Sequence, residues 1–552
     1  MLWSIQQFFK NRTIHKIHHL YNVFFIFLAV VLSIANIRLY KEWGTLLNYR
    51  AFGYLSYPKE VMASVSLLSI IVMALICILI SVAAVLLYKK LSINFSYVYE
   101  KLLIKFIMII SFGSVLVIGA RGGVQQIPIN ESVAYHSNHQ INNHIATNNI
   151  WYLIHSFLDA NEEKNPYYFM DTTEAQKKVK NLFYESTNQT EKILNTDKPN
   201  IVFIVLESWT ADLVKALGGE ENVTPNFDLL RKEGLLFTNA YTSGYRTDQG
   251  LVCIFSGFPA QPNTSIMTVP GKAEKLKSIV SYFDTNGYKS SFYYGGEIGF
   301  ANMKTYLINS GFERLIDKNS FQPDQLGSKW GAYDEYIFEK QLSDLRNEKE
   351  PFFSSILTLS THEPFDVPLK ETPFNGTEEP EQFKKAAYYT DYCLGNYFTA
   401  AKKEKWFSNT LFILVADHGH HHPKNRDMNM PESRKITLLF YGDVIKKEYK
   451  DKTMDKIIAQ NDIPGILLGQ LNADYKDFKW SKNIFNESAR QFAYYSNENV
   501  LGWITPEGVT VYSFASGEVT LNPTGKNTAT ADSLSSDSKA FLQNLYQQYL
   551  EY

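Results

Sequence analysis

The feature that most constrains this chain is a long run of residues that carries almost no charge. It extends from Val61 to Tyr88 and reads VMASVSLLSIIVMALICILISVAAVLLY. About 20 consecutive apolar residues are enough for a helix to cross the hydrocarbon core of a bilayer. The run therefore predicts a transmembrane helix.

Two further apolar segments lie on either side of this run. Phe24 to Ile37 is shorter but is extended by residues 20–23, and Leu102 to Ala120 is interrupted only by Lys105 near its start. We expect both to span the membrane, and a helix buried in a soluble domain is the alternative for each. Residues 1–120 are thus predicted to form a transmembrane anchor of about three helices.

Basic residues indicate the orientation of this anchor. Cytoplasmic loops of membrane proteins carry an excess of lysine and arginine. One basic group precedes the first span and another flanks the loop between the second and third spans: Lys10, Arg12 and Lys16; Lys89, Lys90, Lys101 and Lys105. The loop at 39–61 also carries three basic residues, so the bias is modest. We predict a multi-pass cell-membrane protein whose chain beyond about residue 121 lies outside the cytoplasm.

Composition excludes two other classes of protein. The formal net charge is −2, and no basic stretch with interleaved aromatic residues is present, so no nucleic-acid partner is expected. The three cysteines, Cys77, Cys253 and Cys393, are too few and too irregularly spaced for a disulfide framework or a cysteine metal site.

Residues 121–195 are predicted to form a linker arm that packs partly on the domain it carries. This stretch is polar and rich in asparagine, and the segment at 175–186 is typical of a short amphipathic helix. Its three histidines, His136, His139 and His144, are irregularly spaced in a polar loop. We expect solvated side chains there rather than a metal cluster.

From residue 196 to residue 490, short apolar runs alternate with helical patterns. Strands are expected at 290–296 and 351–359, and helices at 276–286 and 386–403. Such alternation predicts an α/β domain with a mostly parallel central sheet and helices on both faces. Residues 491–552 differ, because hairpin-like strands precede a closing helix at 533–550. They predict a small C-terminal antiparallel subdomain.

Two apolar runs of the α/β region end in residues that bind metals. Ile201 to Val205 leads to Glu207, and Leu411 to Val415 leads to Asp417 and His418. Unbroken apolar runs of this length are typical of strands buried on both faces, and open α/β sheets bind ligands where such strands end. A metal site is one interpretation, and two capped strand ends are the other.

A threonine between these runs adds a possible nucleophile. Thr247 precedes a helical pattern, where free N–H groups favour a phosphate or an alkoxide, although a threonine N-cap would look the same. Its oxygen, together with Glu207, Asp417 and His418, would form a hard, oxygen-rich site for one divalent cation. Such an ion lowers the pKa of a hydroxyl. His362 follows another buried run and is expected at the same edge.

Several short stretches occur together in an order that resembles a known family, the sulfatase-like phosphotransferases of the bacterial envelope, to which lipoteichoic acid synthase belongs. They cover about residues 200–500, below a membrane anchor: LES at 206–208, RTDQG at 246–250, YGGEIGFANM at 294–303, WGAYDEYIF at 330–338, STHEPF at 360–365 and ADHGH at 416–420. The resemblance implies an α/β domain of the sulfatase and alkaline phosphatase type.

The resemblance also implies roles for individual residues. Glu207, Thr247, Asp417 and His418 match the metal ligands, with Thr247 also the nucleophile. The implied metal is manganese, with magnesium or zinc as alternatives. The expected substrate contacts are His362, Glu297, Phe300, Asn302 and Arg246. His420, from the run of histidines after His418, is a further candidate that could bind phosphate or a second metal, and a polar loop is the alternative. The lipoteichoic acid enzymes also place a tryptophan and an arginine near the segment at 294–303, and this segment contains neither.

The function that this resemblance implies is phosphotransfer from a lipid. A substituted phosphate, such as phosphoglycerol or phosphoethanolamine, would pass from a phospholipid donor through a phosphothreonine to an envelope glycan or lipid acceptor. A phosphodiesterase or phosphatase that uses water is the alternative. A sulfuric-ester hydrolase is less favoured, because those enzymes convert a cysteine where this chain has Thr247. A catalytically inactive envelope protein that binds a polymer or a partner enzyme is the third hypothesis.

Overall fold

The structure is a computed structural model, and it divides into two compact units, Met1–Glu162 and Glu163–Tyr552. It describes residues 12–43, 45–53, 67–91, 101–125, 127–137, 139–158, 164–369, 371–521 and 528–552.

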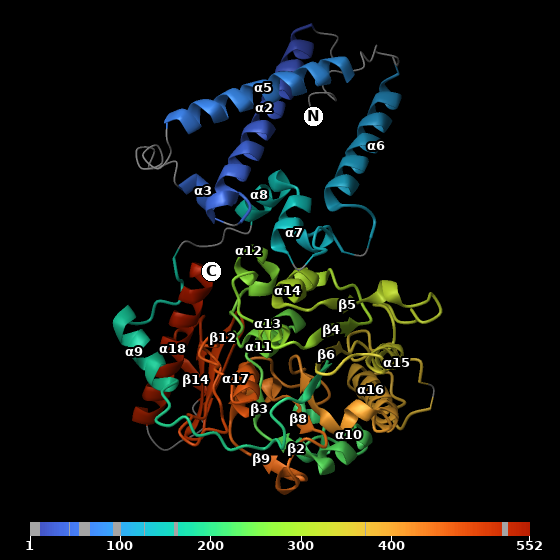
Figure 1. The fold of residues 1–552 in the computed structure, drawn as a ribbon, viewed down its shortest axis with the longest axis vertical. Coiled ribbons are helices and arrows are strands. Elements are labelled where there is room, and N and C mark those ends of the chain that lie inside the picture. Colours follow the sequence, from blue (N-terminus) through green and yellow to red (C-terminus); the bar gives the residue numbers. More distant parts are fainter. Residues whose placement is uncertain are drawn as a thin grey trace. The chain divides into compact units, whose positions relative to one another are not determined.

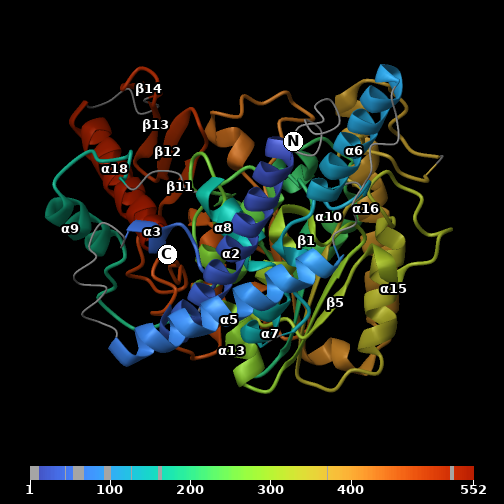
Figure 2. The ribbon, with the colours of Figure 1, turned by 90° about the horizontal axis from the view of Figure 1, so that it is seen from above.

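Three long helices dominate the first unit: α2 (Arg12–Trp43), α5 (Leu67–Leu91) and α6 (Leu102–Arg121) (Figures 1 and 2). Each contains a segment long and apolar enough to cross a membrane, and almost none of the side chains in these segments are buried in the protein. A helix whose apolar side chains face outward all round is stable only in an apolar environment, such as the interior of a bilayer. The three predicted spans are therefore confirmed as helices, although residues 61–66 of the second lie outside the described residues.

The predicted linker arm is divided between the two units. Its short helices α7 (Gln140–Ala146) and α8 (Asn149–Leu158) belong to the first unit, whereas α9 (Thr172–Leu182) belongs to the second. The short helix α3 (Arg50–Gly53), which precedes the arm, also belongs to the first unit. The prediction of three solvated histidines is wrong for His144. Its side chain is buried, and its Nδ1 lies 3.1 Å from the Tyr40 hydroxyl.

A mixed, mostly parallel sheet of eight strands forms the centre of the second unit, as the sequence predicts. Its strand order is β5-β4-β6-β1-β7-β8-β2-β9, and the pairs that contain β8 are antiparallel. The bounds are β1 (Asn200–Leu206), β2 (Gly234–Phe237), β4 (Lys289–Tyr294), β5 (Arg314–Ile316), β6 (Phe352–Leu357), β7 (Thr410–Ala416), β8 (Leu438–Tyr441) and β9 (Lys452–Met454). Strands β3 (Ala240–Tyr241) and β10 (Ile458–Ala459) form a separate pair.

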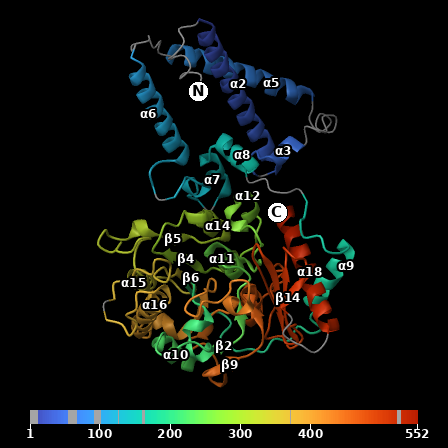
Figure 3. The same ribbon diagram turned by 180° about the vertical axis from the view of Figure 1, so that it is seen from behind.

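Helices cover both faces of this sheet. Neighbouring side chains of a strand point to opposite faces, and in β1 and β7 the side chains on both faces are buried. Phe203 of β1 packs on Phe255 of α11 (Thr247–Ser256), with ring centroids 5.5 Å apart. Phe412 of β7 packs on Phe398 of α16 (Glu379–Ala401) at 5.1 Å. In the sheet register Phe203 pairs with Ile413, so these two side chains point to the same face. Phe412, the neighbour of Ile413, points to the other face. The helices α11 and α16 therefore lie on opposite faces of the sheet (Figure 3).

The remaining helices of the α/β domain connect the strands. They are α10 (Pro225–Leu230), α12 (Pro270–Ala273), α13 (Ile279–Thr285), α14 (Met303–Ser310), α15 (Asp334–Leu345) and α17 (Ile463–Gln470). The helix predicted at 386–403 begins earlier, at Glu379, where a proline occupies the first turn. Proline suits that turn because the N–H it lacks has no partner there.

A small antiparallel sheet follows, which confirms the predicted C-terminal hairpins. Its strands are β11 (Ala493–Ser496), β12 (Val500–Thr505), β13 (Gly508–Ser513) and β14 (Val519–Leu521), paired in that order. The closing helix α18 (Thr528–Glu551) packs on this sheet through Phe541, whose ring lies 4.8 Å from Tyr494 and 5.4 Å from Trp503.

Candidate active site

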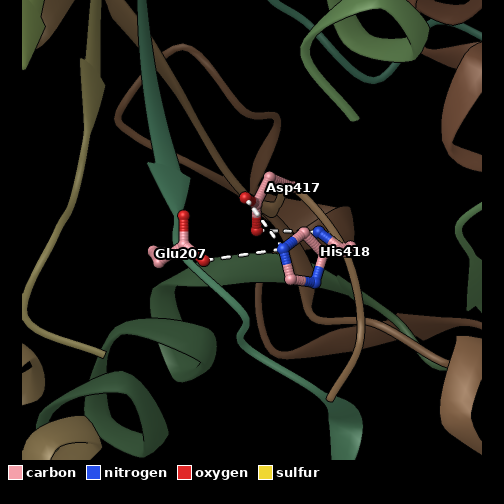
Figure 4. Close-up of side chains that lie close together, drawn as sticks. All are labelled: Glu207, Asp417 and His418. Carbon is pink, nitrogen blue, oxygen red and sulfur yellow. Dashed lines mark hydrogen bonds and ion pairs between the residues drawn. The ribbon is translucent and has the colours of Figure 1, made fainter. Parts of the chain in front are cut away.

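Two neighbouring parallel strands bring together three residues of the types that bind metals. Strands β1 and β7 pair in register up to Leu206 and Ala416, so Glu207 and Asp417 leave the sheet side by side. His418 is the next residue of the chain after Asp417. All three side chains are largely or fully buried (Figure 4). The sequence prediction that these strand ends converge is thus confirmed.

The three side chains are arranged around a common point. His418 Nε2 lies 3.5 Å from Glu207 Oε1 and 3.5 Å from Asp417 Oδ2. One candidate ligand atom from each residue lies within 4.8 Å of the others. The carbonyl oxygen of Gly419 accepts a hydrogen bond from His418 Nδ1 at 2.8 Å, which turns Nε2 toward the carboxylates. A histidine oriented through its other ring nitrogen is typical of metal sites.

The two oxygens of Asp417 differ in a way that fits a bound cation. Oδ1 accepts hydrogen bonds from the backbone N–H groups of Ser208 at 2.8 Å and His418 at 2.7 Å. Oδ2 is buried and has no hydrogen-bond partner among the described residues. A buried carboxylate oxygen without a partner is costly, and a divalent cation would satisfy it. The group can therefore hold a metal.

The charges of the site also favour a cation. Burial and the nearby Glu207 carboxylate raise the pKa of Asp417. Burial acts against the charged form of His418, yet Asp417 and Glu207 outweigh it and raise the pKa of the imidazole to about 9. Burial likewise opposes ionisation of Glu207, but His418 lowers its pKa. The negative charge of Asp417 and Glu207 favours a proton on His418. A divalent ion bound at this place would offset the same negative charge.

The turn after β1 holds Glu207 in a fixed direction. Ser208 adopts a left-handed conformation with φ of 59°, which is strained for a residue with a side chain. Its hydroxyl donates to Glu207 Oε1 at 2.8 Å. The backbone N–H of Glu207 donates to Thr358 Oγ1 at 2.9 Å, and Thr361 donates to its carbonyl oxygen. The tertiary contacts thus keep a strained turn in place.

Thr247 lies at the first residue of α11, and its hydroxyl reaches this group. Its Oγ1 donates to Glu207 Oε2 at 3.2 Å. Arg246, and not Thr247, occupies the N-cap position, so the N-cap interpretation of this threonine is wrong. The helix approaches closely because of Gly250: a Cβ there would lie 2.1 Å from the carbonyl oxygen of Asp417.

Sequence reasoning missed a buried arginine that supports the loop before Thr247. Arg434 is fully buried and donates to the carbonyl oxygens of Gly244 at 2.8 Å and Met428 at 2.7 Å. Its guanidinium lies between the rings of Tyr245 and Tyr495, 5.3 and 5.4 Å from their centroids. Burial lowers the pKa of this group to about 10. A lone arginine carries no pattern that would reveal this role.

The expected substrate contact Arg246 lies at the surface on the same loop. It donates to the Tyr245 hydroxyl at 2.9 Å, and its guanidinium lies 4.9 Å from the centroid of that ring. Tyr245 in turn donates to Glu498 at 2.7 Å. The contacts of Arg246 therefore tie the loop to the C-terminal sheet, and they do not include the three metal-binding residues.

His362 follows β6, as predicted, and stands beside a tryptophan that sequence reasoning left without a role. The Trp330 ring meets the imidazole edge to face at 4.7 Å, and its N–H donates to the carbonyl oxygen of Glu363 at 2.6 Å. His362 is close enough to Glu207 to contribute to its lowered pKa. Phe300 lies 6.4 Å from Trp330, so the three rings form one aromatic rim. The signal was Trp330 itself, at the head of the stretch WGAYDEYIF.

The other expected contacts have partners of their own. Glu297 forms an ion pair with Lys318 at 2.9 Å. Asn302 is buried, and its amide donates to the carbonyl oxygen of Thr268 at 3.2 Å. His420 stacks on Phe383 at 4.4 Å, and burial lowers its pKa to about 3, so its imidazole is neutral. The structure thus joins Phe300 to His362 through Trp330, whereas Glu297 and Asn302 have separate contacts.

Comparison with known proteins supports what the geometry indicates. Residues 199–473 match the sequence model of the Sulfatase family. The chain belongs to the sulfatase family. This segment contains every strand of the central sheet and each of the four residues Glu207, Thr247, Asp417 and His418.

Within this family the chain is a distant relative of lipoteichoic acid synthases. It is 27% identical to the lipoteichoic acid synthase of Staphylococcus saprophyticus over 306 residues, which are 51% of this chain and 46% of that protein. It is 21% identical to lipoteichoic acid synthase 2 of Bacillus subtilis, over 59% of this chain and 52% of that protein. The chain thus spans about half the length of the curated relatives it matches.

Solved structures show the same fold. A protein of the alkaline phosphatase superfamily from Vibrio parahaemolyticus superposes with a TM-score of 0.60 at 25% identity, over 70% of this chain and 97% of that one. The lipoteichoic acid synthase LtaP of Listeria monocytogenes superposes with a TM-score of 0.56 at 16% identity, over 68% and 98%. The second unit is therefore an alkaline phosphatase-like domain.

Proposed function

We propose that this protein is a membrane-anchored, metal-dependent phosphotransferase. It moves a substituted phosphate of the phosphoglycerol or phosphoethanolamine kind from a phospholipid to a glycan or lipid of the cell envelope. The observation that carries the proposal is the hydrogen bond of the Thr247 hydroxyl to Glu207, within a group that fits a divalent cation. The kinship with lipoteichoic acid synthases supports a lipid-linked donor.

In this mechanism Thr247 is the nucleophile and forms a covalent intermediate. Its Oγ1 attacks the phosphorus of the donor, an oxygen–phosphorus bond forms, and the bond to the diacylglycerol oxygen breaks. The hydroxyl proton leaves toward Glu207 Oε2, the carboxylate that accepts it in the hydrogen bond. The diacylglycerol oxygen takes a proton from water. The oxygen of an acceptor hydroxyl then attacks the phosphothreonine, and its proton passes to the hydroxide that the water left behind. The bond between phosphorus and Thr247 Oγ1 breaks, and Thr247 takes its proton back from Glu207.

Glu207, Asp417, His418 and Thr247 would hold the metal, with manganese as the first choice and magnesium or zinc as alternatives. Such an ion lowers the pKa of a hydroxyl and offsets charge on the phosphoryl group. His362 supplies a further donor for the phosphoryl oxygens, and the rings of Trp330 and Phe300 enclose the head group. Arg434 keeps the Thr247 loop in position through Gly244.

A donor lipid labelled separately in its head group and its glyceride tests the proposal. With acceptor withheld, head-group label should stay on the wild-type protein, and intact mass should identify the group added to Thr247. Thr247→Ser should also be labelled, whereas Thr247→Ala should not. Rapid release of the head group into water would identify a hydrolase instead. Turnover of the alanine variant at the wild-type rate would contradict the covalent mechanism.

The proposed orientation places this chemistry outside the cytoplasm, where it meets lipids of the outer leaflet. The basic residues beside α5 and α6, Lys89, Lys90 and Lys105, support it. A reporter fused after residue 125 should be active only outside the cytoplasm, and a reporter near residue 95 only inside. The opposite pattern would contradict the localisation while leaving the active-site chemistry untouched.

A further inference from the structure

Two short helices of the first unit carry apolar side chains that are largely exposed within that unit. On α7, Ile145 is 77% exposed, and on α8, Leu158 is 71% exposed. Ile141, Ile154 and Phe157 are also exposed. In water such a cluster on two adjacent short helices is unfavourable, and it marks an interaction surface. We call these five residues the α7–α8 face.

Other side chains of the two helices are docked on the first long helix. Leu153 of α8 is buried. Asn149 donates to the Ser33 hydroxyl at 3.4 Å, and His144 meets the Tyr40 hydroxyl at 3.1 Å. These contacts connect both short helices to the C-terminal part of α2.

The contacts also define the level of α7 and α8 along that helix. Ser33 and Tyr40 both belong to the candidate membrane span Lys16–Tyr40, and Tyr40 is its last residue. Ser33 lies about two helical turns inside that end, which is roughly 10 Å along the axis. Amphipathic helices at a membrane surface bury their apolar face about 5–10 Å deep. The two short helices therefore stand at the depth of the boundary between head groups and acyl chains.

The chain after α2 fixes this arrangement from a second direction. It turns back on the helix, and the Leu47 N–H donates to Asn36 Oδ1 at 2.6 Å. The Tyr49 N–H then donates to the Ser156 hydroxyl of α8 at 2.9 Å. Leu46 and Leu47 are buried there. Since α8 is held near both of its ends, it cannot leave the level of the span without breaking these bonds.

We propose that α7 and α8 lie in the interface of the bilayer and bind the lipid surface through the α7–α8 face. The occupant is the membrane itself, because both helices contact the end of the candidate span Lys16–Tyr40, whose side chains are not buried in the protein. Trp151 stacks on His155 of the same helix with centroids 3.8 Å apart. Aromatic rings with a polar atom are favoured at this depth. The interfacial helix pair would thus add to the contacts that the three described spans make with the membrane.

Spin labels on the full chain in nanodiscs of phosphatidylglycerol and phosphatidylcholine test this proposal. The background is Cys77→Ala, since Cys253 and Cys393 are buried. Test labels replace Ile145, Ile154 and Leu158, one at a time. Leu79 on α5 and Tyr184 of the second unit, both exposed, provide the lipid and water references, and the exposed Asn142 is the matched polar position on α7. The measurement is relaxation by oxygen, which partitions into lipid, against a water-soluble nickel chelate.

The oxygen-to-nickel ratio of the three test labels should exceed that of Asn142 and Tyr184 by several-fold and approach that of Leu79. A ratio equal to the Tyr184 reference would overturn the proposal, because the face would then be in water. Immobile labels shielded from both relaxants would also overturn it, because protein would then cover the face. Three independent surface positions protect the result against one variant that fails to fold. Neither outcome bears on the chemistry of Thr247.

Discussion

The metal-binding group and the aromatic rim of the active site are built on different kinds of structure. Glu207, Asp417 and His418 directly follow two buried, paired strands, and their contacts are hydrogen bonds with little freedom. Trp330 and His362 lie on loops, partly exposed, and contact each other mainly through ring edges. In the proposed mechanism the scaffold secures the general chemistry, while the loops, which can vary without disturbing the sheet, would select the substrate.

Removing the nucleophile should have the largest effect. Thr247→Ala should lower turnover by about 10⁴-fold or more, because loss of a nucleophile disables the whole catalytic unit. Its unfolding free energy should change by only about 1 kcal/mol, since one hydrogen bond, from the Thr247 hydroxyl to Glu207, is lost. Turnover with labelled donor and thermal unfolding check the two parts. If turnover of the alanine variant stayed within tenfold of the wild-type value, Thr247 would not be the nucleophile, and the contrast between the metal-binding group and the aromatic rim would fail.

The metal-binding group should respond to Asp417→Asn in two ways. Manganese should no longer raise the midpoint of thermal unfolding, whereas it should stabilise the wild type by about 2.7 kcal/mol at a hundred times its dissociation constant. Without metal the variant should be at least as stable as the wild type at neutral pH and above, because burial and Glu207 raise the pKa of Asp417 and so make its charged form unfavourable in the folded state.

Glu379→Gln is the matched control, since that carboxylate is 80% exposed and lies outside the group. It should keep the full response to manganese. A variant of Asp417 that still responds like the wild type would show that the ion binds elsewhere.

The aromatic rim should give an intermediate effect. Trp330→Ala should lower kcat/KM by about tenfold to a hundredfold, the usual range for altered pocket contacts, and the loss should appear mainly in KM. The response to manganese should remain intact. Trp330→Phe should recover most of the loss because it restores a ring against His362. If either variant bound manganese more weakly than the wild type, the aromatic rim and the metal-binding group would not act independently.

The smallest effect should come from Glu297→Gln. This variant tests whether a charged group next to the aromatic rim distinguishes a neutral head group from a cationic one. Its ion pair with Lys318 is partly exposed, so stability should change by less than about 1 kcal/mol. If the head group is neutral, as in phosphoglycerol, kcat/KM should change less than about threefold. If the head group is cationic, as in phosphoethanolamine, loss of the carboxylate should cost about tenfold, or roughly 1.4 kcal/mol. Parallel assays with the two donors separate these outcomes.

Much of the site could be predicted from the sequence because parallel strands end at one edge of the sheet. The apolar runs before Glu207 and before Asp417 were enough to pair two segments that lie far apart in the chain. The helical pattern after Thr247 likewise predicted its place at a helix start. The three apolar spans followed from length and polarity alone. In each case the spacing of apolar residues along a short segment indicates the type of element, because the buried positions of a strand or a helix recur with the period of that element.

Only the tertiary structure revealed the aromatic rim and the support of the nucleophile loop. Trp330 meets His362 because two loops fold onto each other, and no periodic pattern in either loop encodes that contact. Arg434 supports Gly244 from a position far along the chain, between tyrosines from two different segments. His144 was expected in solvent, yet it is buried against α2. Loop side chains take their partners from packing between distant segments, and local sequence does not determine that packing.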